Sequence, residues 1–158
     1  ANTFSKVLLH LEPILHFPCP PGTPRDIRIL AWSDAAHGST YGQSGYLGGH
    51  HLSADQQTTS VFLLLDWSSS KHSRVSFSSI GSKTFAAANA ADRGHALASN
   101  FQALFPNASH NPLFELHVDA KGLYDTITTL HDSKDYRLRS TVSRVLDAFG
   151  AQEIRVLR

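Results

Sequence analysis

Two aspartates follow apolar, strand-like runs of residues, and a lysine stands between them in the chain. Asp34 ends the run at 27–33, and Asp119 ends the run at 114–118. Lys83 lies near the start of a helical pattern between the two. Carboxylate oxygens are the ligands that Mg²⁺ prefers, so two strand-end carboxylates beside a helix start are the layout of a metal-dependent nuclease. Lys83 carries the opposite charge, and the chemistry therefore depends on where it lies.

The composition is that of one folded domain of ordinary size. The chain has 158 residues, of which 41% are hydrophobic and 17% charged, enough to build a single core. Its 14 basic and 13 acidic residues leave a net charge of +1. This balance excludes a nucleic-acid clamp that spans the whole domain, whereas a local basic patch is compatible with it.

Cysteine and histidine do not indicate a metal site. The single cysteine, Cys19, excludes an internal disulfide and a zinc site built from thiolates. Ten histidines are scattered along the chain; His50 and His51 are adjacent, but neighbours on a strand point to opposite faces. No apolar run approaches the roughly 18 residues needed to span a bilayer, and no signal peptide is visible. We therefore expect an intracellular protein, nuclear or cytoplasmic, without membrane contact.

Residues 1–25 differ in pattern from the rest of the chain. Apolar side chains recur at helical spacing in residues 4–14, namely Phe4, Val7, Leu8, Leu11 and Ile14. A proline-rich stretch at 18–24 follows and breaks the pattern. We interpret residues 1–25 as a leading helix and linker, and residues 26–158 as the folded domain.

Within residues 26–158, strand and helix patterns alternate. The predicted elements are strands at 27–33, 45–52 and 61–67 (with 74–77 as an extension), a helix at 82–104, a strand at 113–118, a short helix with Leu123, Ile127 and Leu130 on one face, a helix at 136–149 capped by Gly150, and a strand at 153–157. In the first helix the predicted buried stripe is Phe85, Ala88, Leu97, Phe101 and Leu104. The order β-β-β-α-β-α-α-β predicts an α/β fold, a mixed five-stranded sheet with helices packed on its faces.

Four motifs within these elements resemble one known family. They are Trp-Ser-Asp-Ala-Ala at 32–36, Ser-Gly-Tyr-Leu at 44–47, the tryptophan, Ser-Lys and valine pattern of 65–75, and Asp-Ala-Lys-Gly-Leu at 119–123. As a set they resemble the ribonuclease H domain of long-terminal-repeat retroelement polyproteins, and residues 4–17 are similar to the connecting segment that precedes it. The resemblance implies a ribonuclease H-like fold over 26–158, here without the last helix of the family.

For the activity, the resemblance implies metal-dependent cleavage of the RNA strand in an RNA–DNA hybrid. In such a site, four carboxylates hold two Mg²⁺ ions about 4 Å apart. Asp34 matches the first carboxylate and Asp119 the third. Lys83 occupies the place of the glutamate, and the fourth carboxylate would lie beyond Leu157. Two of the four ligands implied by the resemblance are therefore missing.

The exchange of glutamate for lysine predicts loss of the metal. It changes the local charge by two units, and each unit pair at about 4 Å is worth on the order of 4 kcal/mol at an effective dielectric near 20. We expect no useful Mg²⁺ binding, and a Lys83 ammonium that bridges Asp34 and Asp119. Three other acids, Asp66, Asp92 and Asp125, are too far from the site or better explained by other roles.

Other candidate residues have both functional and structural interpretations. A basic stretch, Lys134, Arg137, Arg139 and Arg144, is a candidate nucleic-acid contact or a solvated helix face. Asp34 is also compatible with the start of a turn, and Asp119 with the N-cap of the following helix. Trp32 and Trp67 are interpreted as core residues.

Two functions remain open from the sequence. In the first, the domain is a catalytically inactive ribonuclease H-like scaffold without a cofactor, which binds a protein partner, its larger parent polypeptide, an RNA–DNA hybrid or RNA. In the second, it is an active endonuclease that uses two Mg²⁺ ions at Asp34 and Asp119 to cut the RNA strand of RNA–DNA hybrids.

Overall fold

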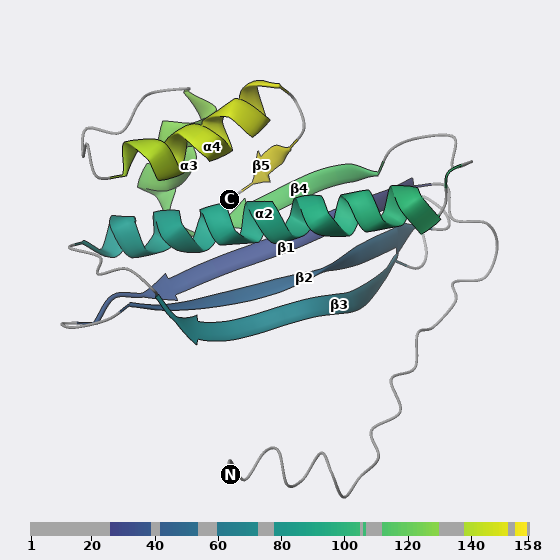
Figure 1. Ribbon diagram of the computed structural model, residues 1–158, viewed down its shortest axis with the longest axis horizontal. Coiled ribbons are helices and arrows are strands. Elements are labelled where there is room, and N and C mark those ends of the chain that lie inside the picture. Colours follow the sequence, from purple (N-terminus) through teal and green to yellow (C-terminus); the bar gives the residue numbers. More distant parts are fainter. Residues whose placement is uncertain are drawn as a thin grey trace, which may run out of the picture.

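The computed structural model describes residues 26–38, 42–53, 60–72, 78–104, 106, 112–129, 138–151 and 154–157. The predicted leading helix and linker at 1–25 lie outside the described residues, as do the strand extension at 74–77 and Leu130. The elements are β1 (Asp26–Ala36), β2 (Gln43–Ser53), β3 (Ser60–Lys71), α2 (Ser79–Leu104), β4 (Leu113–Val118), α3 (Lys121–Thr128), α4 (Arg139–Gly150) and β5 (Arg155–Leu157). The predicted order of elements is confirmed (Figure 1).

The five strands form one mixed sheet in the order β3-β2-β1-β4-β5. Strands β1, β2 and β3 pair antiparallel through short connections, whereas β4 runs parallel to β1, and β5 parallel to β4. The parallel pairs arise because the chain crosses back through helices between those strands. The fold class predicted from the sequence, a mixed five-stranded α/β sheet with helices packed against it, is confirmed.

The long helix α2 packs closely against the centre of the sheet. Its buried face is built mainly from alanine, which lets the helix backbone approach strands β1 and β4. Gly94 lies against the ring of Phe114, and a side chain at this position would overlap that ring. The core side chains of the strands, Ile29, Ala31 and Leu116, are completely buried. This contact fixes the position of the first turn of α2 relative to the ends of β1 and β4.

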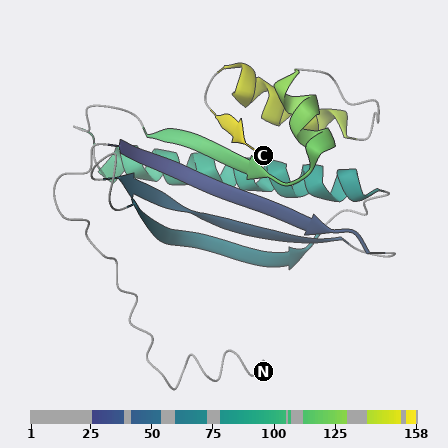
Figure 2. The ribbon, with the colours of Figure 1, turned by 180° about the vertical axis from the view of Figure 1, so that it is seen from behind.

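The two shorter helices bury their apolar stripes against the same core. Leu123 and Ile127 of α3 are buried as predicted, as are Val142 and Val145 of α4. All described helices therefore contribute to one face of the sheet, and the reverse view shows β1, β2 and β3 in front of α2 (Figure 2). None of these helices has the length and apolar character required to cross a bilayer.

The structure corrects the predicted start of α2 and its last buried residue. Helix α2 begins at Ser79, three residues earlier than predicted, because the Ser78 hydroxyl accepts a hydrogen bond from the Gly81 amide at 3.0 Å and caps the helix. At the other end, Leu104 was predicted to be buried and is 74% exposed. It is the last residue of α2 and continues the helical spacing where no strand lies beneath it.

Three expectations about the other helix ends were also wrong. The N-cap of α3 is Ala120, which makes no side-chain capping bond, so Asp119 does not cap this helix. The helix predicted at 136–149 is described as Arg139–Gly150, and Gly150 is its last residue while Ala151 is the C-cap. The Asp119 carboxylate is instead engaged by the side chain of Lys83.

Candidate functional site

Asp34 and Asp119 lie together because β1 and β4 are parallel neighbours. Ser33 pairs with Val118 in the register of the two strands, and each aspartate follows its paired residue by one position. Both carboxylates are accessible, with side chains 75% exposed for Asp34 and 54% for Asp119. One oxygen of Asp34 accepts a hydrogen bond from the Ala35 amide at 2.7 Å, which orients the carboxylate at the strand end. The two acids predicted from the sequence thus converge at one edge of the sheet.

The first turns of α2 place Lys83 between these two carboxylates. Its ammonium donates a hydrogen bond to Asp119 and lies 3.7 Å from the nearer oxygen of Asp34. The neighbouring Ser82 is fully buried, and its hydroxyl lies 3.3 Å from Nδ1 of His37, just past the end of β1. This contact, not anticipated from the sequence, ties the start of α2 to the end of β1. The lysine therefore bridges two strands from the helix.

The environment of Lys83 favours its charged form. The hydrogen bond to Asp119 raises the pKa of the Lys83 ammonium, and the negative charges of Asp119 and Asp34 add to this effect. Partial burial acts in the opposite direction and is outweighed. With two carboxylates and one ammonium, the three side chains carry a net charge of −1. The positively charged Lys83 ammonium thus lies between the Asp34 and Asp119 carboxylates.

This set of side chains does not fit a pair of divalent cations. Mg²⁺ takes about six oxygen ligands in octahedral geometry, whereas the site offers two carboxylates that share an ammonium. Across the described ranges no group of three or more His, Cys, Asp or Glu side chains could hold a metal ion.

Two of the three acids considered as substitutes pair with arginines. Asp66 receives two hydrogen bonds from Arg93, at 2.7 and 2.6 Å, in a bidentate pair. Asp92 forms an ion pair with Arg144 between α2 and α4. Asp125 is exposed on α3. The Asp66 and Asp92 carboxylates are thus each paired with an arginine.

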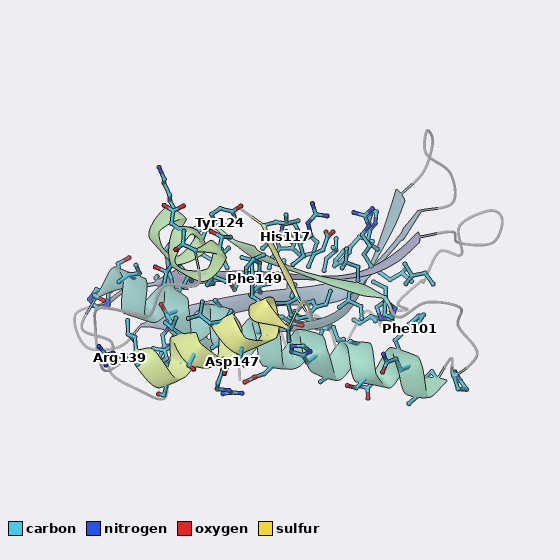
Figure 3. All side chains as sticks on the ribbon, turned by 90° about the horizontal axis from the view of Figure 1, so that it is seen from above. Phe101, His117, Tyr124, Arg139, Asp147 and Phe149 are labelled. Carbon is cyan, nitrogen blue, oxygen red and sulfur yellow. The ribbon has the colours of Figure 1, made fainter. Side chains whose placement is uncertain are left out.

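The basic stretch is described only in part. Lys134 and Arg137 lie outside the described residues, whereas Arg139 begins α4 and is exposed (Figure 3). Arg144 pairs with Asp92, so its guanidinium serves the contact between α2 and α4. This ion pair was not predicted from the sequence, and it gives Arg144 a structural role.

A wide hollow of about 710 Å³ opens beside the two aspartates. It is lined by Trp32, Ser33, Asp34, Gly45, Tyr46, Leu47, Trp67, Ser68, Ser69, His117, Val118 and Asp119. Trp67 is 59% exposed, which corrects its interpretation as a core residue. Strand β3 is an edge strand of the sheet, and no described helix covers the face on which Trp67 lies. We call this hollow the open-face groove.

Comparison with known proteins gives similarity at the level of structure. No protein-family model matches the chain, and no curated protein matches its sequence. Ribonuclease H1 from the halophilic archaeon Halobacterium salinarum is similar with a TM-score of 0.50 and 16% identity over 82% of this chain and 85% of that one. LC11-RNase H1, isolated from compost by a metagenomic approach, has a TM-score of 0.49 and 13% identity over 83% of each chain. A structure of LC11-RNase H1 in complex with an RNA/DNA hybrid has a TM-score of 0.48 and 12% identity over 82% of each. At 16% identity, the likeness to the Halobacterium protein shows the fold alone, and this fold is ribonuclease H-like.

Proposed function

We propose that this chain is a ribonuclease H-like domain of retroelement descent that has lost two-metal catalysis and acts as a binding scaffold. The observation that carries the proposal is the position of Lys83, whose ammonium contacts both Asp34 and Asp119. The retroelement descent is supported by the four sequence motifs, whose described residues lie on β1, on β2, at the end of β3 and at the start of α3.

The charge at the site argues against a working metal centre. A divalent cation beside Asp34 and Asp119 would have to displace the Lys83 ammonium or stand next to it. Repulsion between like charges at about 4 Å costs on the order of several kcal/mol at an effective dielectric near 20, and solvent screening at this partly exposed site reduces that figure. The lysine also neutralises one of the two charges that would attract the ion. Both effects weaken metal binding.

A scaffold role with a protein partner or the parent polypeptide fits the surface better than one with nucleic acid. The open-face groove presents exposed Trp67 and Leu47, and apolar patches of this kind mark binding surfaces. Arg144, a candidate phosphate contact, is engaged by Asp92.

The decisive experiment is a cleavage assay on an RNA–DNA hybrid with Mg²⁺ or Mn²⁺, with calorimetric titration of the same ions. We expect neither cleavage nor stoichiometric binding for the native chain, and tighter ion binding for Lys83→Glu. The matched control is Lys71→Glu, which makes the same charge change on an exposed lysine of edge strand β3.

Two results would contradict the proposal. One is cleavage by the native chain that Lys83→Glu does not improve, which would indicate an active endonuclease with ligands in other positions. The other is Mg²⁺ or Mn²⁺ bound near-stoichiometrically by the native chain at millimolar concentration or tighter. Tight binding of intact RNA–DNA hybrid without cleavage would instead indicate that the scaffold binds a nucleic acid and not a protein.

A further inference from the structure

The first turn of α2 lies at the end of the sheet where β1 and β3 finish and β2 begins (Figure 1). Ser82 in this turn is completely buried, and its hydroxyl lies 3.3 Å from Nδ1 of His37, just past β1. Gly42, just before β2, accepts a hydrogen bond from the backbone amide of His72 at 2.8 Å. We call His37, Gly42, His72 and Ser82 the helix-start cluster.

The members of the helix-start cluster are packed tightly around Gly42. A Cβ at Gly42 would lie 2.5 Å from Cδ2 of His72 and 2.9 Å from the hydroxyl oxygen of Ser82. The His72 ring and the Ser82 hydroxyl therefore both pack directly on the glycine backbone. The His72 ring also lies beside Phe85 of α2, with ring centroids 6.0 Å apart. The cluster thus joins the first turns of α2 to the ends of three strands.

Within this cluster His72 has no free counter-charge for a protonated ring. Its Nε2 is buried and has no hydrogen-bond partner among the described groups. The hollow beside the ring has one described carboxylate, Asp92, which is paired with Arg144. Burial accordingly lowers the pKa of His72 below its usual value of 6.5.

The other titratable groups around His72 are basic. They are Lys71 on β3, Arg144 on α4, Lys83 next to Ser82 on α2, and His37 past the end of β1. Residues 42–44, at the start of β2, carry no titratable side chain. His37 is exposed, and its Nδ1 can donate to the Ser82 hydroxyl in the charged ring as well. The acid-sensitive member of the cluster is therefore His72.

We propose that the helix-start cluster is an acid-sensitive switch, in which neutral His72 holds the first turn of α2 against the strand ends and protonated His72 releases it together with Lys83. Lys83 directly follows Ser82, so displacement of this turn moves the ammonium away from Asp34 and Asp119. The released state leaves both carboxylates without their bridge. The switch goes beyond the proposed function and does not rest on it, because the same four contacts hold the turn whether or not the site is catalytic.

The direction of the pH effect follows from the pKa of His72. Because this pKa is lower in the closed state than in the open state, the open state binds more protons in the interval between the two values. The closed state has its full stability above pH 6.5 and loses it as the pH falls towards the lowered pKa. The equilibrium constant for opening rises by at most about tenfold for each pH unit in that interval.

Amide hydrogen exchange of the full chain, followed by NMR, measures this opening. The Ser82 amide donates to the Ser78 carbonyl at 3.1 Å, so it exchanges when the first turn opens. The amide of Ala90, a completely buried residue in the middle of α2, reports on opening of the whole helix. Division of each rate by the intrinsic rate at the same pH gives the two opening constants.

We expect the opening constant at Ser82 to exceed that at Ala90 at every pH, and to rise about fivefold between pH 7.5 and 5.5. In His72→Gln, which keeps a polar side chain that does not titrate, the rise at Ser82 should be less than about twofold. His95→Gln is the matched control. It removes a histidine of α2 whose ring packs on Phe114, outside the cluster, and should keep the native rise.

A third variant tests whether Lys83 moves with the first turn. Lys83→Met should raise the opening constant at Ser82 by about fivefold at every pH, which corresponds to about 1 kcal/mol, and leave its pH dependence unchanged. If Lys83→Met has no effect at Ser82, the lysine is not released with the turn and the proposal fails.

Three further results would overturn the proposal. One is an equal opening constant at Ser82 and Ala90, which would mean that the first turn opens only when the whole helix does. Another is a native rise at Ser82 that persists in His72→Gln. The third needs no variant and is a titration of the His72 ring signals in the native chain with a midpoint at or above pH 6.5.

Discussion

The Lys83 ammonium donates a hydrogen bond to the Asp119 carboxylate, which lies 36 residues further along the chain. With Asp34 3.7 Å away, the lysine holds the ends of two parallel strands against the first turns of α2. We predict that Lys83→Met lowers the free energy of unfolding by about 1 kcal/mol, the range of a charge-assisted bond between partly exposed groups. Urea unfolding at low and high salt measures it, and the loss should shrink as salt rises. If Lys83→Met is instead more stable than the native chain, the repulsion between the Asp34 and Asp119 carboxylates does not need the Lys83 ammonium to offset it.

The ion pair between Arg93 and Asp66 should contribute more to stability than the contacts of Lys83. Arg93 holds both oxygens of Asp66, donates to the Ser68 hydroxyl at 2.6 Å, and lies 4.7 Å from the centroid of the Tyr46 ring. Its side chain is 32% exposed. We predict that Arg93→Met lowers the free energy of unfolding by about 2–3 kcal/mol, since a bidentate pair and a cation–π contact are lost together.

The control for Arg93 is the pair between Arg144 and Asp92, whose side chains are 64% and 50% exposed. Arg144→Met should cost less than about 1 kcal/mol, because exposed ion pairs are weak. Chemical unfolding of the two variants in one buffer compares them. Equal losses would show that burial does not distinguish these two pairs.

The strand and helix order could be predicted because it depends on local periodicity. The strand at 113–118 was placed at its observed bounds, and Leu123, Ile127, Val142 and Val145 were assigned to apolar faces that are buried. That Asp34 and Asp119 share one site was expected from the family resemblance, and the parallel pairing of β1 with β4 brings them together. Strand bounds and apolar helix faces depend on residues that are close together in the sequence.

Other features depend on which elements become neighbours and could not be predicted. The apolar run of β3 does not indicate that β3 is an edge strand, and so the exposure of Trp67 was missed. The pairing of Asp66 with Arg93 joins β3 to α2 across 27 residues. A charged residue within an apolar strand was the available signal, since such a group requires a partner. The register shift between Gly48 and Gly49 likewise has no marker beyond the two glycines.

Two glycines with opposite surroundings test the packing of the sheet. Gly94→Ala should lower the free energy of unfolding by about 1–3 kcal/mol, because its Cβ overlaps the Phe114 ring and overpacking outweighs the gain in helix propensity. Gly45→Ala should be neutral or stabilise by up to about 1 kcal/mol, since it meets open space and removes the backbone entropy of glycine. Urea midpoints of both variants give the comparison. Stabilisation by Gly94→Ala would show that α2 can move away from β4 at little cost.

Acid should weaken the domain through its partly buried histidines. Burial lowers the pKa of His50, of His72 and of His117 below the usual value of 6.5. Each is therefore held neutral by folding, and its contribution is present above pH 6.5 and is lost as the pH falls through the lowered pKa. His50 packs against the Phe101 ring, and its Nε2 is buried with no hydrogen-bond partner among the described groups. His50→Phe should keep the native stability at pH 8 and lose less of it at pH 5. Parallel pH profiles for this variant and the native chain would refute the assignment.

Alkali should weaken the domain through Tyr46. Burial, with a smaller contribution from the charge of Asp66, raises the pKa of the Tyr46 phenol from 10.0 to about 12, and Arg93 opposes the rise. A raised pKa means that the contribution of the neutral phenol is complete below pH 10 and is lost as the pH climbs from 10 towards 12. A change of this size corresponds to at most about 3 kcal/mol.

Tyr46→Phe isolates this effect. The Tyr46 hydroxyl is buried and has no hydrogen-bond partner in the described ranges, so its removal should change stability at pH 7 by less than about 1 kcal/mol. Between pH 10 and 12 the variant should lose less stability than the native chain, and the remaining loss should include the deprotonation of Lys83, whose pKa is also raised. Urea unfolding across this range measures the difference, and Tyr124→Phe on α3 is the matched control. If the native chain and Tyr46→Phe lose stability in parallel up to pH 12, the phenol is not what limits the domain in alkali, and the ammonium between Asp34 and Asp119 becomes the group to test.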